Sequence, residues 1–171
     1  MNKLIIPAII IFAAFTRLIP HPPNFTPIIA MGLFGGAYLK DRRLVFLIPL
    51  IAMIIADFFL GFHGTMIWVY GSLIIIAMLG ILLKNRATMK NCVVAALGGS
   101  LIFFLVTNFG VWFVSGFYAR SIAGLITCYT MALPFFHNTL AGSVVYSAIM
   151  FGGYEGLKNY LPDSVPDSIR K

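Results

Sequence analysis

Asp57 has the strictest chemical requirement in this sequence, because it is the only carboxylate inside a predicted apolar helix. An isolated charge in such a place costs roughly a few kcal/mol, so Asp57 needs a partner or must be neutral. Arg17 is the candidate partner nearest to it in predicted depth. We expect an ion pair that brackets a ligand or holds a loop over it; the alternative is a structural pair that locks the first and third helices together.

The stretch of residues 17–25 carries three types of polar group on a predicted rigid loop. Four of the nine prolines lie between Pro20 and Pro27, which excludes a regular helix there. His21 adds an imidazole and Asn24 a carboxamide to the guanidinium of Arg17. We expect this loop to cover one end of a binding pocket.

A second set of polar residues lies on one face of a predicted helix. Asn108, Trp112 and Ser115 are spaced at i, i+4 and i+7. An amide beside an indole suits a planar polar ligand, since the ring stacks and the amide both donates and accepts hydrogen bonds. The alternative is that Asn108 joins two helices while Trp112 anchors the chain at an interface.

His137 and Asn138 follow Pro134, where we expect a helix to begin, so the pair could cap that helix. Alternatively, Asn138 and Gly142, one turn apart, open a notch that faces Asn108. We favour the notch, because an amide in an apolar environment requires a partner.

The composition predicts a protein of the lipid bilayer. Of the 171 residues, 60% are hydrophobic and only 10% are charged, and the mean hydropathy is +0.97. Such a chain has too little polar surface to cover a soluble globule. The net charge of +7 comes from short basic clusters between apolar runs, which is typical of membrane topology and speaks against nucleic-acid binding.

The apolar runs predict an all-α bundle of six transmembrane helices in one domain, residues 1–161, followed by a cytoplasmic tail, residues 162–171. The first two helices are short and could form a re-entrant hairpin, and residues 115–133 are mixed in character. The predicted spans are residues 4–19, 26–39, 44–61, 66–83, 91–114 and 135–154.

The basic residues predict which ends of the helices face the cytoplasm. If both termini are cytoplasmic, ten of the twelve basic residues are inside, and only Arg17 and Arg120 are outside. All three histidines and most polar side chains of the spans then lie in the outer half. Such a distribution indicates a cup open to the exterior, since a pore would carry polar groups along its whole depth.

The predicted substrate-binding residues therefore come from the loop and from the outer halves of the helices. We expect no catalytic residue, no metal site and no cofactor. The binding residues are Arg17, His21, Asn24, Asp57, Asn108, Trp112, Tyr129, His137 and Asn138.

Small residues also recur at the spacing of close helix packing, which indicates contacts inside the bundle or, at one of them, a docking face. The pairs are Gly32 and Gly36, Ala52 and Ala56, and Ala95 and Gly99.

Several phrases in the sequence resemble an uncharacterised bacterial family of small six-span transport proteins. They are R-x-x-P-H-x-x-N-F-x-P at residues 17–27, A-D-x-x-L-G at 56–61, T-N-x-x-x-W at 107–112, and C-Y-x-x-x-L-P-F-x-x-N at 128–138. That family in turn is similar to the substrate-binding S components of energy-coupling factor vitamin transporters.

This resemblance implies a six-helix protein of the bacterial cytoplasmic membrane that captures a vitamin or a precursor outside. The loop at residues 20–25 would act as a lid. The resemblance also implies docking to a transmembrane coupling subunit that carries two cytoplasmic ATPases. The first helix departs from the S-component pattern, because Ala8, Ala13 and Ala14 form no pair four residues apart, so a protein that works alone stays open.

Two other classes of function stay open. An intramembrane enzyme would need Asp57 close to His21 or His137. A structural subunit of a membrane complex would need neither. The sequence contains no ATP-binding glycine loop, so any ATPase must be another chain.

Overall fold

The computed structural model describes residues 2–160, which form six α-helices, one short 3-10 helix and no strand. The predicted all-α class is therefore confirmed, whereas the predicted tail, residues 162–171, lies outside the described residues. The elements are α1 (Asn2–Phe15), η1 (Thr16–Leu18), α2 (Ile28–Tyr38), α3 (Arg42–Leu60), α4 (Met66–Leu82), α5 (Met89–Val114) and α6 (Ile122–Tyr160).

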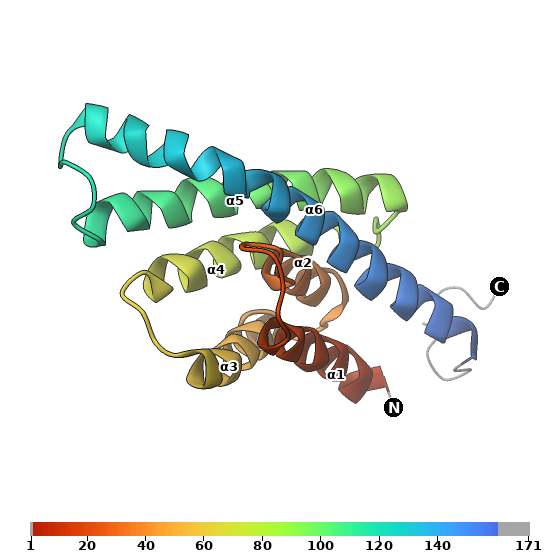
Figure 1. The fold of residues 1–171 in the computed structure, drawn as a ribbon. Helices are drawn as coiled ribbons and strands as arrows, with labels where there is room; N and C mark the ends of the chain where they lie inside the picture. The colour runs from red at the N-terminus through yellow and green to blue at the C-terminus, as the bar shows by residue number, and fades with distance from the viewer. Residues whose placement is uncertain (1, 161–171) are drawn as a thin grey trace.

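Helix α2 is the centre of the fold. Ten of its eleven residues are buried, and it contacts each of the other five α-helices (Figure 1). A helix enclosed on every side has no need of a polar face, which explains why its sequence is apolar all round.

Glycines let α2 and α4 approach until their backbones touch. A Cβ atom added at Gly36 would collide with the backbone of Ala77, and one added at Gly80 would lie 2.5 Å from the carbonyl oxygen of Leu33. A Cβ atom at Gly99 on α5 would likewise meet Ile29 of α2, at 2.8 Å. Gly36 and Gly99 each belong to a predicted pair of small residues, and both make internal contacts, as predicted.

The first two helices are short, as predicted. With 11 residues, α2 is about 16 Å long, roughly half of a 30 Å hydrocarbon core. By contrast, α3 (19 residues) and α5 (26 residues) are long and apolar enough to cross a membrane. Leu4–Leu18 and Met66–Leu82 form shorter apolar helices.

The prediction that a helix starts at Pro134 is wrong. Helix α6 has 39 residues and continues through Pro134, so His137 and Asn138 lie in its interior and cap nothing. A proline removes one hydrogen bond of the helix, and an apolar helix packed against neighbours tolerates this loss. The predicted span 135–154 is thus the middle of a helix about 58 Å long.

The α5–α6 hairpin extends past the ends of α3 and α4 (Figure 1). Residues 115–121, predicted to be mixed in character, form its turn, and Ile122–Tyr160 returns along α5. Helices α1 to α4 lie to one side of this hairpin, where both α4 and α2 pack against α5.

Candidate functional site

Arg17 and Asp57 form the predicted ion pair. The Nη1 atom of Arg17, on η1, donates to Oδ1 of Asp57, on α3, at 2.7 Å. Only 11% of the Arg17 side chain and 3% of the Asp57 side chain are exposed. The same Nη1 atom lies 3.3 Å from the sulfur of Met53, one turn before Asp57.

Tyr70 completes this group, and sequence reasoning missed it. Its hydroxyl donates to Oδ2 of Asp57 at 2.9 Å. The distance of each residue from the end of its helix could have identified Tyr70. Asp57 lies one turn before the end of α3, and Tyr70 lies one turn after the start of α4. Because α3 and α4 are successive antiparallel helices, these two residues lie at the same height along the helix axes. We call Arg17, Met53, Asp57 and Tyr70 the Arg17 site.

The Arg17 site presents donors rather than acceptors. Both oxygens of Asp57 accept a hydrogen bond from a protein side chain. The hydrogen bonds of Arg17 use only Nη1, so within residues 2–160 its Nε and Nη2 atoms have no protein partner. A guanidinium carries five N–H donors in a planar fork, and this fork matches a carboxylate or phosphate.

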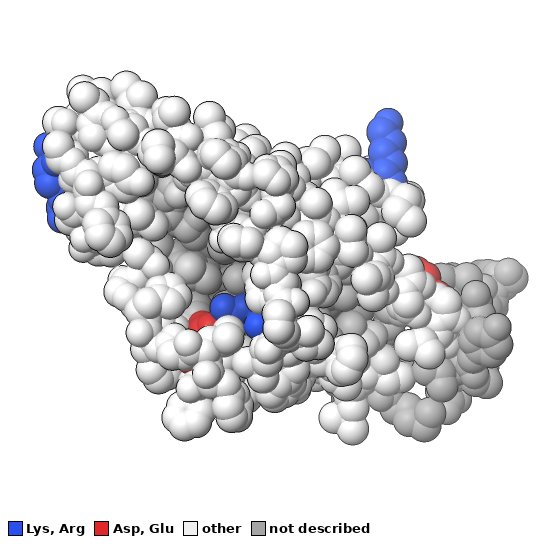
Figure 2. All heavy atoms as spheres, in the orientation of Figure 1, with Lys and Arg blue, Asp and Glu red and all other residues white. Residues whose placement is uncertain are grey.

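One face of the molecule has a hollow that contains charged atoms. Figure 2 shows basic and acidic atoms side by side in a hollow, at the place where Figure 1 draws the end of α1 beside α3. Most of the face around the hollow is uncharged. An anion entering the hollow would meet few competing charges on this face.

The proline-rich loop is attached to α6. The Nδ2 atom of Asn138 donates to the carbonyl oxygen of Pro23 at 3.0 Å. A Cβ atom at Gly142 would lie 3.0 to 3.2 Å from the backbone of Phe25 and Thr26. The notch at Gly142 therefore holds the loop, and the prediction that it faces Asn108 is wrong.

Three other predicted binding residues lie on the surface. His21 and Asn24 are exposed on the loop, where Nδ1 of His21 is 2.7 Å from the carbonyl oxygen of Ile19. Asn24 has a φ of 64°, a left-handed conformation that asparagine adopts more easily than most residues. His137 is exposed on α6. Among the described residues, no hydrogen bond joins these side chains to the Arg17 site.

The remaining three predicted residues bind backbone within the α5–α6 hairpin. Asn108 donates to the carbonyl oxygen of Phe104 at 2.8 Å, and Trp112 donates to that of Ala119 at 2.9 Å. Tyr129 donates to the carbonyl oxygen of Leu105 at 2.7 Å. These contacts stabilise the hairpin, and a ligand role for the three residues stays a prediction.

The described residues that could ligate a metal are dispersed. Across residues 2–160, no three side chains of His, Cys, Asp or Glu lie close enough together to hold a metal ion. Cys92 and Cys128 are buried free thiols.

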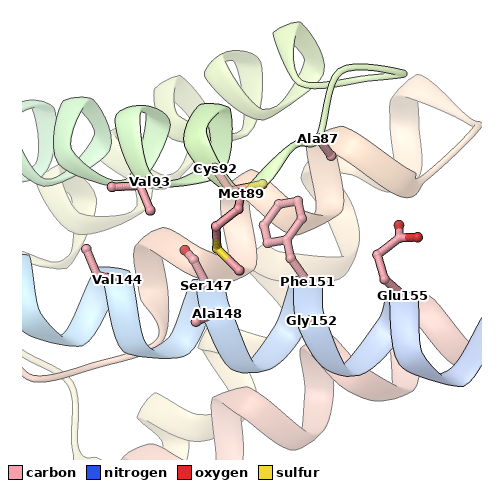
Figure 3. A pocket seen from close by; sticks show the side chains of 10 residues that line it. All are labelled: Ala87, Met89, Cys92, Val93, Val144, Ser147, Ala148, Phe151, Gly152 and Glu155. Atoms are coloured by element: carbon pink, nitrogen blue, oxygen red, sulfur yellow. The ribbon is translucent and has the colours of Figure 1, made fainter.

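A cavity of about 210 Å³ lies at the other end of the bundle, where α5 begins and α6 ends (Figure 3). Sequence reasoning missed it, because its walls are mostly small apolar residues that resemble ordinary packing positions. Its lining residues are Ala87, Met89, Cys92, Val93, Val144, Ser147, Ala148, Phe151, Gly152 and Glu155.

Comparison with known proteins gives a family without an assigned function. Residues 1–164 match the model of a family of unknown function, DUF6580, and the chain belongs to this family. No curated protein and no solved structure matches the chain.

Proposed function

We propose that this DUF6580 protein is a multi-pass protein of the bacterial cytoplasmic membrane that captures a micronutrient, a vitamin or its precursor, from outside. It would serve as the substrate-binding component of an uptake system. The observation that carries the proposal is the Arg17 site, a buried ion pair whose guanidinium has N–H donors without a partner among residues 2–160.

The surface of the chain supports a bilayer location. Large apolar side chains are exposed on several helices, including Phe58 (71%), Ile67 (73%) and Ile122 (79%). Soluble proteins rarely expose apolar patches on this scale. Helix α1 begins and α6 ends on the same side of the molecule, which agrees with an even number of crossings (Figure 1).

The chemistry of the Arg17 site favours a ligand with an oxyanion or a carbonyl group. Asp57 fixes Arg17 from one side, so the guanidinium needs no rearrangement to bind. Its free edge, Nε and Nη2, can donate two parallel hydrogen bonds to one carboxylate or phosphate. A vitamin or precursor that carries such a group fits the site.

The loop at residues 19–27 supports a role in covering the ligand. Asn138 and Gly142 seat its backbone on α6, while η1, at its start, supplies Arg17. One short segment thus links the α5–α6 hairpin to the ion pair. Uptake driven by ATP would require a separate coupling subunit with ATPases, and this chain would provide binding alone.

The geometry favours binding over catalysis. An enzyme that uses Asp57 as a base would need this carboxylate in contact with an imidazole or with substrate. Asp57 instead accepts from Arg17 and Tyr70, and its side chain is 3% exposed. A carboxylate in this state orients its neighbour more readily than it removes a proton.

A double substitution tests the proposal. Arg17→Met combined with Asp57→Leu replaces the pair by apolar side chains, which often leaves the stability of a protein unchanged. Mass spectrometry of protein purified in mild detergent without dialysis should detect a small molecule in the wild type and at least ten-fold less in the double variant. Folded yield from size-exclusion chromatography should stay the same.

Arg120→Met is the matched control, because Arg120 is the other arginine predicted outside and rests over the ring of Phe113 at 4.6 Å. It should keep the bound molecule. Equal ligand content in the double variant and the wild type, or no small molecule in either, would show that the ion pair is only a link between helices.

A further inference from the structure

The cavity between α5 and α6 has at its wall a polar atom that no described residue satisfies. Ser147 is 3% exposed, and its hydroxyl oxygen is buried without a hydrogen-bond partner among the described residues. An unpaired buried hydroxyl is unfavourable, because it has lost the hydrogen bonds that water provided. Neighbouring serines at the helix interface do find partners, as Ser143 does with Ser100 at 2.7 Å.

The side chains around Ser147 form a pocket rather than a packed seam. Met89 and Cys92 of α5 point toward Ser147 and Phe151 of α6 across the cavity (Figure 3). Ala148 and Gly152 also line it and are exposed, so the cavity opens to the surface beside them. An engineered cavity of about 150 Å³ binds benzene, so about 210 Å³ accommodates one ring with a substituent.

One charged residue, Glu155, lines the cavity at its mouth. Glu155 lies two turns beyond Ser147 on the same face of α6, with Phe151 between them. Its Oε1 atom accepts from Tyr38 at 2.5 Å and from Lys158 at 2.7 Å. This carboxylate adds acceptors at the entrance, which disfavours an anionic ligand and admits a neutral or cationic one.

We propose that this cavity is a binding site for a small amphiphile: a single-ring aromatic molecule or a short aliphatic chain that bears a hydroxyl or amino group. The apolar walls take the body of the ligand, and Ser147 takes its polar group. A bare hydrocarbon, including the tail of a bilayer lipid, would leave the hydroxyl of Ser147 unpaired. The site is separate from the Arg17 site and does not depend on it.

Nuclear magnetic resonance of the Met89 methyl group tests this site directly, because Met89 lines the cavity. The protein is labelled on its methionine methyl groups, reconstituted in lipid nanodiscs, and titrated with benzyl alcohol, toluene or benzoate. Met89→Leu assigns the signal. Benzyl alcohol should shift it saturably, toluene should bind about five-fold more weakly, the loss expected for one hydrogen bond, and benzoate at least ten-fold more weakly.

Two substitutions and one matched control locate the ligand. Gly152→Leu fills the mouth of the cavity, and its neighbour Gly153→Leu is the matched control, since a Cβ atom at either position meets nothing within 4 Å and Gly153 does not line the cavity. Affinity for benzyl alcohol should fall at least ten-fold in Gly152→Leu and change less than two-fold in Gly153→Leu. Ser147→Ala, which removes only the unpaired hydroxyl, should abolish the preference for benzyl alcohol over toluene.

Several results would overturn the proposal. A Met89 signal that does not saturate, or that responds equally in Gly152→Leu, places no ligand in the cavity. Equal affinities for toluene and benzyl alcohol in the wild type remove the role of Ser147.

Discussion

At the scale of single residues, Tyr70 has the clearest energetic role, because it supplies the second hydrogen bond to a buried carboxylate. Tyr70→Phe leaves Oδ2 of Asp57 without this donor. We expect the free energy of unfolding to fall by about 1.5 to 3 kcal/mol, the range for hydrogen bonds to charged groups. Thermal unfolding in detergent measures the change.

Tyr129→Phe is the control for Tyr70→Phe, since its hydroxyl donates to the uncharged carbonyl oxygen of Leu105. It should cost less, about 0.5 to 1.5 kcal/mol. If the free energy of unfolding falls equally in the two variants, the hydrogen bond from Tyr70 to the charged Asp57 contributes no more than one to an uncharged carbonyl.

Glu155, which follows the last predicted span, makes the stability of the protein depend on pH. Burial raises its pKa, but hydrogen bonds from Lys158 and Tyr38 outweigh this effect and leave the pKa below its ordinary value of 4.5. A pKa lowered by folding stabilises the protein above the unfolded value, and this contribution disappears as the pH falls through the folded value.

The test compares the wild type with Glu155→Gln. At pH 7 the wild type should be more stable by no more than about 0.5 kcal/mol, because a surface ion pair is screened by solvent. This difference should shrink as the pH falls below 4.5 and through the lowered pKa of the folded state, as seen by thermal unfolding at several pH values. If the wild type instead gained stability over Glu155→Gln as the pH falls, the lowered pKa of Glu155 would be contradicted.

The sequence contained enough information to pair Arg17 with Asp57, since a lone carboxylate among apolar residues requires a cation at the same depth. It did not reveal that Asn108 donates to a carbonyl oxygen of its own helix while Asn138 donates to a carbonyl oxygen of the proline-rich loop. Depth along a helix follows from residue number, whereas the direction of a side chain around the helix depends on which neighbours pack there. Tyr70 was missed because its ring is common at membrane interfaces.

At the scale of elements, the α2–α4 contact is the most sensitive to a small change. Gly36→Ala would drive a methyl group into the backbone of α4, which side-chain rotation cannot relieve. We expect a loss of about 2 to 3 kcal/mol or failure to fold. Melting temperature and folded yield are the measurements.

Gly71→Ala is the matched control on α4, because a Cβ atom there meets nothing within 4 Å. It should be neutral or slightly stabilising, since alanine favours helix more than glycine does. A normal melting temperature for Gly36→Ala would mean that the two helices are less closely packed than described.

Helix boundaries were predictable where charges, glycines or caps interrupt the apolar runs. The predicted spans 44–61 and 66–83 agree with Arg42–Leu60 and Met66–Leu82 to within two residues at each end. The prediction failed at Pro134, because proline was treated as a stop. Packing of α6 along α5 outweighs the single hydrogen bond that Pro134 removes.

At the scale of the whole molecule, the proposed orientation predicts which surface positions are accessible from outside the cell. In a background with Cys92→Ala and Cys128→Ala, Arg120→Cys should react with a membrane-impermeant maleimide in intact bacterial cells. Lys40→Cys should react only after lysis. Both positions are exposed in the structure, so accessibility in the protein does not limit the reaction.

Labelling of Lys40→Cys in intact cells, at the rate seen for Arg120→Cys, would contradict the orientation. It would also move the Arg17 site to the cytoplasmic side, because η1 and the residue 115–121 turn are predicted on one side. Capture of a nutrient from outside would then be excluded.

The enclosure of α2 also bears on how the chain is assembled. In a bilayer, an eleven-residue helix is too short to span by itself, and its ten buried residues need neighbours on every side. Those neighbours, α4 above all, leave the ribosome later. The first segments to be synthesised are therefore among the last to reach their final position, and the membrane or a chaperone must hold them until the rest arrives.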